Sequence, residues 1–452
     1  MVFSTPLFLF FFLPIFLILY FLLPYKNITL LIFSLIFYAW GEPIYVLLMI
    51  FSSIVDFNIG KKIEKVNNKK FYLILSIFIN LLILTFFKYC DFLIEIINYI
   101  LSLNIDYLNL PLPIGISFFT FQTMSYSIDV YKKQIKAEKK FLNFMTYVCM
   151  FPQLIAGPIV RYKDISKELI TKKISINNFY KGFIIFLEGL FLKVLLANNI
   201  GFIFNEIIKI NINDISILTM WLAIISFTFQ IYFDFSGYSK MAIGIGKMIG
   251  FTYIDNFNYP FLSTSISEFF RNWHISLGNF FKDYVYIPLG GNKKHLFRNL
   301  FVVWFLTGLW HGASINFVIW GLYLGFIIYL EKTILKNILT KIPNIIKKIT
   351  TFILIVISFY IFAFDNINDL INYGKILFGF TSNKIIDNLF LFYIKDNFIL
   401  ISLCILFCFK VKKIFDERVE DRLKEFIYFI LYIITISYLL SSSFNPFLYF
   451  RF

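Results

Sequence analysis

Long apolar runs separated by short basic linkers extend along almost the whole chain. A membrane helix needs about 20 apolar residues to cross a hydrocarbon core of roughly 30 Å. Runs of this kind occupy residues 6–23, 28–59, 71–87, 113–128, 141–155, 179–196, 215–233, 300–330, 352–364, 389–409 and 426–440. The pattern predicts an all-α polytopic membrane protein with on the order of ten or more membrane helices. It excludes a soluble domain held by one anchor.

The run at residues 28–59 is too long for one span and contains Gly41-Glu42-Pro43. Proline lacks the N–H that a helix interior needs, so we expect two shorter helices here. The next linker, residues 61–70, holds five lysines against one glutamate and indicates a cytoplasmic loop. Counting back through three spans places the N-terminus on the extracytoplasmic side, whereas one tilted span over residues 28–59 would reverse that orientation.

Four further linkers are basic, and each is expected to be a solvated loop or an interfacial helix. They cover residues 132–140, 161–173, 336–348 and 410–424. The 452 residues are 59% hydrophobic and 15% charged, with a formal net charge of +15. In a membrane protein this basic excess indicates cytoplasmic loops beside anionic lipid and not a nucleic-acid partner. Because no Gly/Ser-rich linker or repeat divides the sequence, we predict a single membrane domain over residues 1–452.

One histidine lies within an apolar run. The run at residues 300–330 has His311 as its only readily ionisable side chain, and Gly308, Gly312, Ala313 and Ser314 surround it. The run exceeds one span and its small residues allow close packing, so we expect a bend or two packed helices there. An ionisable group at membrane depth indicates function. His311 is either a general base, kept neutral by desolvation, or a core imidazole bonded to a neighbouring helix.

A second histidine lies in the segment at residues 263–291. Ser265 and Glu268 have capping-box spacing, which predicts a helix start. The pattern that follows predicts one interfacial amphipathic helix ending near Pro288, with His274 at the border of its apolar stripe, placed to reach inward. The apolar face contains Phe269, Phe270, Trp273, Leu277, Phe280, Phe281 and Tyr284, and the polar face contains Arg271, Asn272, Ser276, Asn279, Lys282 and Asp283. His274 has a functional role or only anchors the helix, and His295 is expected to be solvated.

Several chemistries lack their sequence signatures. The chain contains no phosphate loop, no GxSxG nucleophile elbow and no HExxH motif. The cysteines Cys90, Cys149, Cys404 and Cys408 lie in apolar runs without ligand spacing, so no metal site or disulfide framework is expected. Two hypotheses remain from the residues alone: an acyl-transfer site around a buried histidine, or a transporter with His311 as proton relay.

Motifs along nearly the whole chain resemble the membrane-bound O-acyltransferases, and within them the alginate and peptidoglycan O-acetyltransferase branch. These motifs are MVFSTPLFLFFFLP at Met1, FYAWGEP at Phe37, LPIGISFFTFQTMSYSIDVY at Leu112, FPQLIAGPIVRY at Phe151, FDFSGYSKMAIGIGKMIG at Phe233, FRNWHISLGNFFKDYVYIPLGGNK at Phe270, LTGLWHGASINFVIWG at Leu306 and NPFLYFRF at the C-terminus. The resemblance implies a ring of roughly 10–12 transmembrane helices, with interfacial and re-entrant helices, around a central tunnel. It places the catalytic core at approximately residues 110–330.

The resemblance also implies the site residues and the donor. His311 matches the family's catalytic histidine and His274 its second functional histidine. The expected donor is acetyl-CoA from the cytoplasm, used as a substrate, with no bound cofactor or metal. The candidates for lining the donor tunnel are Asn272, Arg271, Trp310, Asp283 and Lys282. Lys282, Lys293, Lys294 and Arg298 could attract CoA phosphates, or they could be plain lipid-facing charges.

The resemblance further implies a bacterial cytoplasmic membrane, a polysaccharide acceptor and an extracytoplasmic partner of the SGNH or serine-esterase-like kind. The aromatic tail at residues 441–452 contains Tyr449, which we hypothesise carries the acyl group as a tyrosyl ester. The alternative for Tyr449 is an interfacial aromatic belt. The alternative functions are transfer of D-alanine to teichoic acid, acylation of a lipid or protein, and proton-coupled transport.

Overall fold

The computed structural model describes residues 1–155 and 157–441. Its elements are helices, and the extended pairing within this described part is an isolated bridge between Phe257 and Trp273. The chain divides into two compact units. The first unit contains Met1–Phe186 and Tyr238–Ile254, and the second contains Leu187–Gly237 and the chain from Asp255 onward. The expectation of a single domain over residues 1–452 stays a prediction.

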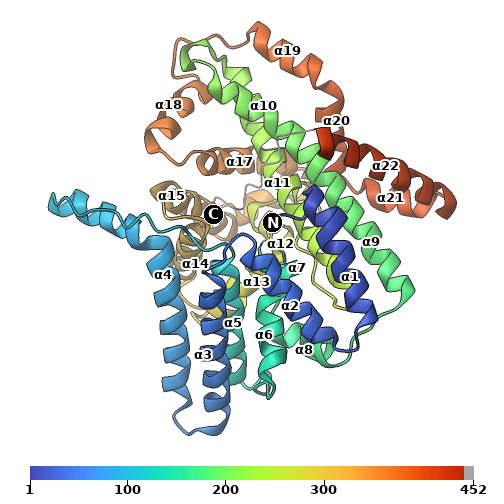
Figure 1. The fold of residues 1–452 in the computed structure, drawn as a ribbon. Coiled ribbons are helices and arrows are strands. Elements are labelled where there is room, and N and C mark those ends of the chain that lie inside the picture. Colours follow the sequence, from blue (N-terminus) through green and yellow to red (C-terminus); the bar gives the residue numbers. More distant parts are fainter. Residues whose placement is uncertain (156, 442–452) are drawn as a thin grey trace. The chain divides into compact units, whose positions relative to one another are not determined.

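The first unit is built from helices of very different length (Figure 1). They are α1 (Leu13–Leu22), α2 (Lys26–Ala39), α3 (Val46–Lys65), α4 (Lys69–Leu101), α5 (Ile116–Tyr131), α6 (Phe141–Cys149), α7 (Phe151–Leu154) and α8 (Tyr162–Ile170). The break between α2 and α3 at Gly41-Glu42-Pro43 confirms the predicted interruption of the apolar run at 28–59. Helices α3, α4 and α5 pack side by side.

A buried carboxylate joins these three helices. Asp56 of α3 is fully buried, and it accepts hydrogen bonds from Asn80 of α4 at 2.7 Å and from Ser127 of α5 at 3.0 Å. The Ser76 hydroxyl of α4 donates to the same carboxylate. A buried acidic group is tolerated only when its oxygens are hydrogen-bonded in this way. The polar network therefore specifies how the three helices pack.

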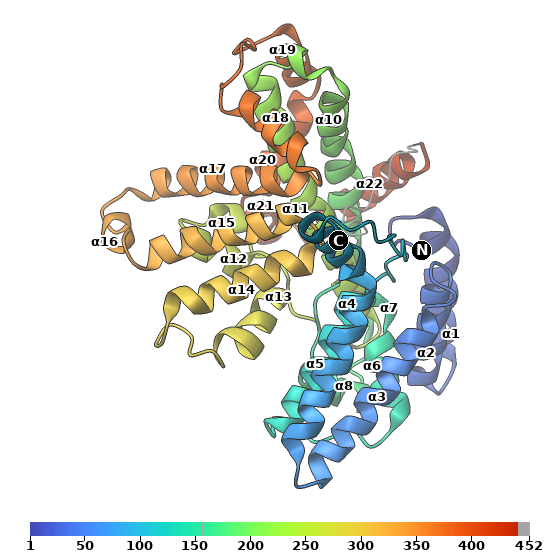
Figure 2. The ribbon, with the colours of Figure 1, turned by 90° about the vertical axis from the view of Figure 1, so that its left-hand side faces the viewer.

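The second unit contains the remaining helices. Helices α9 (Ile176–Phe191) and α11 (Ile217–Met248) contribute residues to both units, and α10 (Asn198–Lys209) belongs to the second. The rest are α12 (Ile266–Asn272), α13 (Ile275–Phe281), α14 (Leu296–His311), α15 (Ile315–Lys332), α16 (Lys336–Leu339), α17 (Asn344–Ala363), α18 (Ile367–Leu377), α19 (Asn388–Asp396), α20 (Phe398–Phe407), α21 (Val411–Arg418) and α22 (Asp421–Ser441). Helices α14 and α15 lie side by side as a hairpin (Figure 2).

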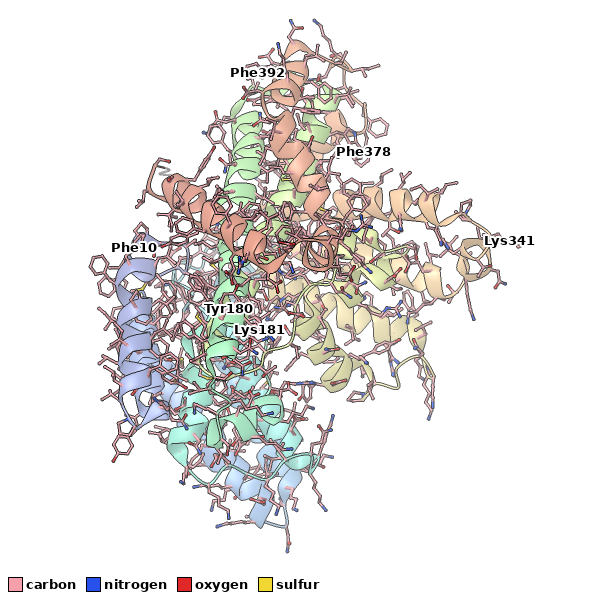
Figure 3. The ribbon with its side chains drawn as sticks, turned by 90° about the vertical axis from the view of Figure 1, so that its right-hand side faces the viewer. Phe10, Tyr180, Lys181, Lys341, Phe378 and Phe392 are labelled. Carbon is pink, nitrogen blue, oxygen red and sulfur yellow. The ribbon has the colours of Figure 1, made fainter. Side chains whose placement is uncertain are left out.

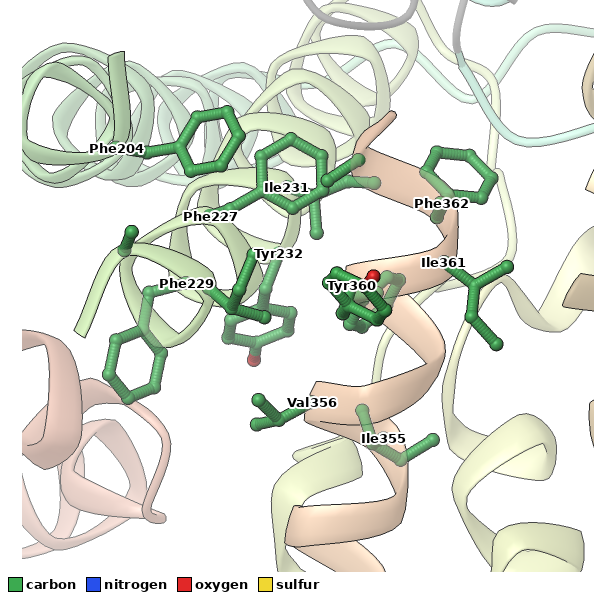
Figure 4. Close-up of a cluster of buried hydrophobic side chains, with 14 of the residues drawn as sticks. Phe204, Phe227, Phe229, Ile231, Tyr232, Ile355, Val356, Tyr360, Ile361 and Phe362 are labelled. Atoms are coloured by element: carbon green, nitrogen blue, oxygen red, sulfur yellow. The ribbon is translucent and has the colours of Figure 1, made fainter. Parts of the chain in front are cut away.

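Aromatic and aliphatic side chains from α10, α11 and α17 form the core of the second unit (Figure 4). The Phe204 and Phe227 rings lie 4.9 Å apart, and Tyr360 and Phe362 belong to the same cluster. Aromatic pairs of this kind contribute about 0.5–1.5 kcal/mol beyond their buried area. Phe359 of α17 extends the core to Trp273, whose ring centroid is 5.2 Å away. This packed core supports the segment that carries His274.

The surface composition fits a membrane. Six described helices are long and apolar enough to cross a bilayer, or seven if the bent pair α19 and α20 forms one span. Large apolar side chains such as Phe10, Phe378 and Phe392 are exposed, as expected for positions facing lipid (Figure 3). The all-α polytopic class is therefore confirmed. The candidate spans are fewer than ten because several apolar segments form shorter helices, such as Phe8–Leu22 and Lys26–Ala39.

The basic linker at residues 61–70 differs from its prediction as a loop. Helix α3 continues through Lys65 and α4 begins at Lys69, so only residues 66–68 connect them. Lysine is a good helix former, and lysines in the last turn interact favourably with the negative end of the helix dipole. Lys62 and Lys65 occupy the last turn of α3. The charge run therefore ends one helix and begins the next.

Candidate active site

His311 is the last residue of α14, and the α14–α15 hairpin fixes its place. Glycines let the two helices approach closely: a Cβ on Gly308 would lie 2.3 Å from the Phe317 carbonyl oxygen, and one on Gly321 would lie 2.3 Å from that of Trp304. The chain leaves helical geometry at Gly312, and the Ser314 hydroxyl accepts a 3.4 Å hydrogen bond from the Asn316 amide at the start of α15. Of the two expected alternatives, a bend or two packed helices, the structure shows two packed helices.

Aromatic rings surround the His311 imidazole. Its ring centroid lies 4.8 Å from that of Trp310, 4.9 Å from that of Trp320 and 5.2 Å from that of Phe362. His311 is 6% exposed, so its ring is largely removed from solvent. Imidazolium is disfavoured in apolar surroundings, whereas neutral imidazole is tolerated and can accept a proton. The environment therefore suits a general base.

His274 lies at a break between two short helices, where the sequence predicts one continuous amphipathic helix. That prediction is wrong: α12 ends at Asn272, α13 begins at Ile275, and His274 has φ 45° and ψ 52° in the left-handed region. The cause is tertiary, because Phe257 forms a bridge with Trp273 and the Asn258 amide donates to the Asn272 carbonyl at 3.0 Å. A neighbouring segment thus takes over backbone groups that a continuous helix would pair internally.

The break also changes which residues are buried. Ser276, placed on the polar face by helical periodicity, is 2% exposed. The predicted helix start at Ser265 is confirmed, because the Ser265 hydroxyl accepts a 3.0 Å hydrogen bond from the Glu268 amide. The Glu268 carboxylate instead accepts from Thr264, at 2.8 Å from its amide and 2.7 Å from its hydroxyl. The capping interaction is therefore shifted by one residue from the expected box.

The His274 side chain points inward, as the sequence predicts. It is 3% exposed, and its ring centroid lies 4.5 Å from that of Phe235 and 5.8 Å from that of Trp310. Burial lowers the pKa of His274 to about 3, so its imidazole is neutral at physiological pH. Trp310 touches both histidine rings. The structure thus brings the two predicted histidines to one tryptophan.

Both histidines also line a cavity of about 1170 Å³ within the second unit. Its wall comes from α12, α13, the π-helical turn Lys282–Tyr286, the following loop, α14 and α15. The charged residues of the wall are Arg271, Lys282, Lys293, Glu331 and Lys332. Four cations against one carboxylate favour an anionic ligand. The volume slightly exceeds the upper end of the roughly 300–1,000 Å³ range usual for small-molecule sites.

Two of the five predicted tunnel-lining residues line this cavity, and three are absent from its described lining. Arg271 and Lys282 line the cavity, whereas Asn272, Asp283 and Trp310 are not among its described lining residues. The Asn272 side-chain amide donates to the Glu268 carbonyl at 3.2 Å, and Asp283 is half-buried in the π-helical turn. Trp310 lies behind the wall against both histidines.

Of the four basic residues that were candidates for binding CoA phosphates, two line the cavity and two do not. Lys293 lines the cavity beside Lys282, but Lys294 and Arg298 are absent from the described lining. The Arg298 guanidinium donates to the Leu289 carbonyl at 2.9 Å, so it supports the loop between the π-helical turn and α14. His295 is exposed, as predicted.

Two cavity residues at the end of α15, Glu331 and Lys332, are not predicted from the sequence. The Lys332 ammonium donates to the Asn292 side-chain oxygen at 2.9 Å. The Glu331 carboxylate accepts from the amides of Ile266 and Ser267 at 2.6 and 2.9 Å, and so caps the start of α12. The only available signal was an acid and a base directly after a long apolar run. Their partners lie in segments that no local pattern connects to α15.

The sequence also does not predict the buried ion pair between Lys193 and Asp234. Lys193 and Asp234 are 2.7 Å apart with side chains 1% and 2% exposed, and the Lys193 ammonium also donates to Asn198 at 2.8 Å. Lys193 lies in the π-helical turn Leu192–Ala197. Removing one partner of such a pair leaves an uncompensated buried charge. The pair joins this turn to α11 next to Phe235, the residue that contacts His274.

Comparison with known proteins is consistent with these features. Residues 131–370 match the model of the MBOAT, membrane-bound O-acyltransferase family. The chain is 39% identical to the probable alginate O-acetylase of Pseudomonas aeruginosa, over 81% of this chain and 73% of that protein. It is 32% identical to the peptidoglycan O-acetyltransferase of Helicobacter pylori, over 100% of this chain and 98% of that protein. It is also 29% identical to the teichoic acid D-alanyltransferase of Bacillus subtilis, over 46% of this chain and 56% of that protein. The chain belongs to the membrane-bound O-acyltransferase family and is a multi-pass membrane acyltransferase.

Proposed function

We propose that this protein moves acetyl groups from cytoplasmic acetyl-CoA across the bacterial inner membrane for O-acetylation of an extracytoplasmic polysaccharide. The observation that carries the proposal is that His311 and His274 line one cavity whose other charged groups are mainly cationic. The names of the alginate and peptidoglycan relatives support acetyl transfer to a cell-surface glycan. Alginate, another exopolysaccharide and peptidoglycan are all acceptors within this proposal.

The transfer step assigns a proton acceptor to His311. A hydroxyl oxygen attacks the thioester carbonyl carbon while the neutral imidazole accepts the hydroxyl proton. The tetrahedral intermediate collapses, the carbon–sulfur bond breaks and CoA leaves as a thiolate. The imidazolium then returns its proton to the sulfur, so the products are an acetyl ester and free CoA thiol. The apolar rings around His311 keep water from competing with the hydroxyl.

The cations of the cavity wall are assigned to the CoA phosphates. Arg271, Lys282, Lys293 and Lys332 all line the cavity that the two histidines reach. Lysine and arginine bind phosphate oxygens through charge-assisted hydrogen bonds. Glu331 offsets only one of these four positive charges, and its carboxylate accepts from the amides at the start of α12. Donor binding should therefore weaken as salt is raised.

A separate partner completes the transfer in this proposal. It is an extracytoplasmic protein of the SGNH or serine-esterase-like kind that delivers acetyl to the polysaccharide hydroxyl. Tyr449, the hypothesised acyl carrier, lies outside the described residues. If Tyr449→Phe keeps full transfer to the partner while His311→Ala abolishes it, the carrier hypothesis is wrong.

The likeness to a teichoic acid D-alanyltransferase supports a second candidate, transfer of a D-alanyl group from a different thioester donor. It uses the same histidine and differs in the donor. Acylation of a lipid or protein would differ only in the acceptor. Proton-coupled transport, the candidate of another class, predicts substrate flux without release of CoA.

The test is thiol release from acetyl-CoA by the protein in nanodiscs, with and without its partner. His311→Ala is compared with Asn383→Ala, which loses an asparagine bonded to the Ile212, Asn213 and Ile215 carbonyls, away from the cavity. We expect thiol release by the wild type and Asn383→Ala, and release lowered by about 10²–10⁴-fold in His311→Ala. Release from a D-alanyl thioester alone would favour the second candidate. Failure with every thioester, together with proton-driven flux, would replace the proposal by transport.

A further inference from the structure

A short segment, residues 256–258, lies along the break between α12 and α13. The Asn258 amide donates to the Asn272 carbonyl at 3.0 Å, and Phe257 and Trp273 form the antiparallel bridge. The Phe257 and Trp273 rings also meet edge to face, with centroids 5.0 Å apart. Asn258 and Phe257 therefore pair with Asn272 and Trp273, the two residues that directly precede His274.

Asn256 binds the first amides of α13. Its carbonyl oxygen accepts from the Ile275 amide at 3.0 Å, and its side-chain oxygen Oδ1 accepts from the Ser276 amide at 3.1 Å. The first amides of a helix have no acceptor within that helix and need one from outside. Bulk solvent does not reach these groups, because Asn256 is 1% exposed and Ser276 2% exposed. Asn256 thus caps the N-terminus of α13, although it lies in another segment of the chain.

His274 occupies the N-cap position of α13 but makes no side-chain capping hydrogen bond. Its imidazole instead packs edge-on against Phe235 at 4.5 Å. A left-handed conformation is unfavourable for a residue with a Cβ and persists only where the surroundings hold it. Asn256 therefore caps α13 in place of the His274 side chain, and the backbone of His274 is held in the conformation in which the ring lines the cavity.

We propose that Asn256 is a positioning residue for His274. This inference rests on the proposed function, in which His274 supports acyl transfer. Asn256 is not among the described residues that line the cavity, so it acts through His274 and not through contact with the donor. Its side-chain nitrogen Nδ2 has no hydrogen-bond partner among the described residues. Oδ1, which accepts from the Ser276 amide, is therefore the side-chain atom through which Asn256 caps α13.

The first experiment measures thiol release from acetyl-CoA by Asn256→Ala and Asn256→Asp. Loss of the cap should let the 272–275 backbone relax, and small displacements of a positioned group can lower a rate by about a hundredfold. We expect Asn256→Ala to lower kcat on the order of tenfold to a hundredfold with KM for acetyl-CoA unchanged. Asn256→Asp keeps an oxygen acceptor and is an equally good cap, so it should recover most of the loss. A rise in KM without a fall in kcat would overturn the inference.

A double-mutant cycle separates positioning from general stability. If Asn256 acts through His274, the effects of the two substitutions on kcat are not additive. Adding Asn256→Ala to a His274→Ala protein should therefore lower kcat by less than about a further twofold. An equal loss in both backgrounds would overturn the inference while leaving the proposed function intact. Asn383→Ala is the control, because the half-buried Asn383 donates to the Ile212 and Ile215 carbonyls elsewhere in the second unit and its loss should keep the wild-type kcat.

A second readout does not depend on activity. The chain has three histidines, so modification by diethylpyrocarbonate can be assigned to His274, His295 or His311 by mass spectrometry. In Asn256→Ala we expect faster modification of the buried His274 with His311 unchanged, and wild-type rates in Asn256→Asp. An unchanged His274 rate in the folded Asn256→Ala protein would overturn the inference. The proposed function fails separately, if the wild type releases no thiol from acetyl-CoA.

Discussion

The two histidines of the cavity are held by different kinds of structure. His311 ends a 16-residue helix whose partner, α15, follows directly in the chain, and glycine contacts fix the distance between the two helices. His274 lies between two helices of seven residues each. Helices that short are marginal by themselves, so their placement depends on contacts from outside. The first histidine is thus fixed by local packing and the second by residues 256–258.

The largest effect should follow from removing the histidine that local packing fixes. A positioned general base contributes about 10²–10⁴-fold to a rate. We expect His311→Ala to lower thiol release by that factor without changing the unfolding midpoint greatly, because the hairpin contacts remain. Steady-state kinetics with acetyl-CoA check the rate, and thermal unfolding in nanodiscs checks the fold. Near-normal release by a folded His311→Ala protein would remove the distinction between the two histidines.

The burial of His274 predicts a dependence of stability on pH. Burial lowers its folded-state pKa to about 3, whereas an unfolded histidine titrates near 6.5. Between those values the unfolded chain binds the proton and the folded chain does not, so stability is fully present above about pH 6.5 and falls as pH is lowered. From pH 6.5 to 5 the loss is on the order of 2 kcal/mol.

The measurement compares the wild type with His274→Gln, which is uncharged throughout. Carboxylates titrate in both proteins, so only the difference between their unfolding free energies reports on His274. The wild type should lose more stability than the variant from pH 7 to 5. Parallel curves would mean that His274 becomes protonated inside the folded protein.

The hairpin itself can be tested where α14 and α15 approach closely, at Gly308. Gly308→Ala adds a Cβ that would lie 2.3 Å from the Phe317 carbonyl oxygen, so α14 and α15 must separate. Overpacking of this kind costs about 1–3 kcal/mol, and His311 moves with its helix. We expect a lower unfolding midpoint and reduced thiol release. In the control, Gly41→Ala, the nearest atom to the new Cβ is 3.8 Å away and stability should hold. Equal stability of both variants would show that His311 does not depend on the close approach.

The sequence predicts features that depend on neighbouring residues and does not predict features that depend on contacts between distant segments. The helix break near Gly312, the burial of His311 and the Ser265 helix start can be predicted, because their signals lie within a few residues of each other. The break at His274 cannot, because periodicity indicates a continuous helix and the competing contacts come from residues 256–258. The linker at 61–70 was predicted as a loop because charge indicated solvent exposure but not whether the chain remains helical.

The smallest expected effect concerns the cavity cations, which depend on tertiary placement as His274 does. Lys332 lines the cavity and Lys294, in a nearby loop, does not. A single exposed or half-buried charge pair is worth about 0.2–1 kcal/mol, so Lys332→Gln should raise KM for acetyl-CoA by roughly two- to fivefold and weaken its salt dependence, with kcat retained. Lys294→Gln should leave KM unchanged, although both substitutions remove one positive charge from the protein. Equal changes in the two variants would mean that net charge, and not the wall of the cavity, attracts the donor.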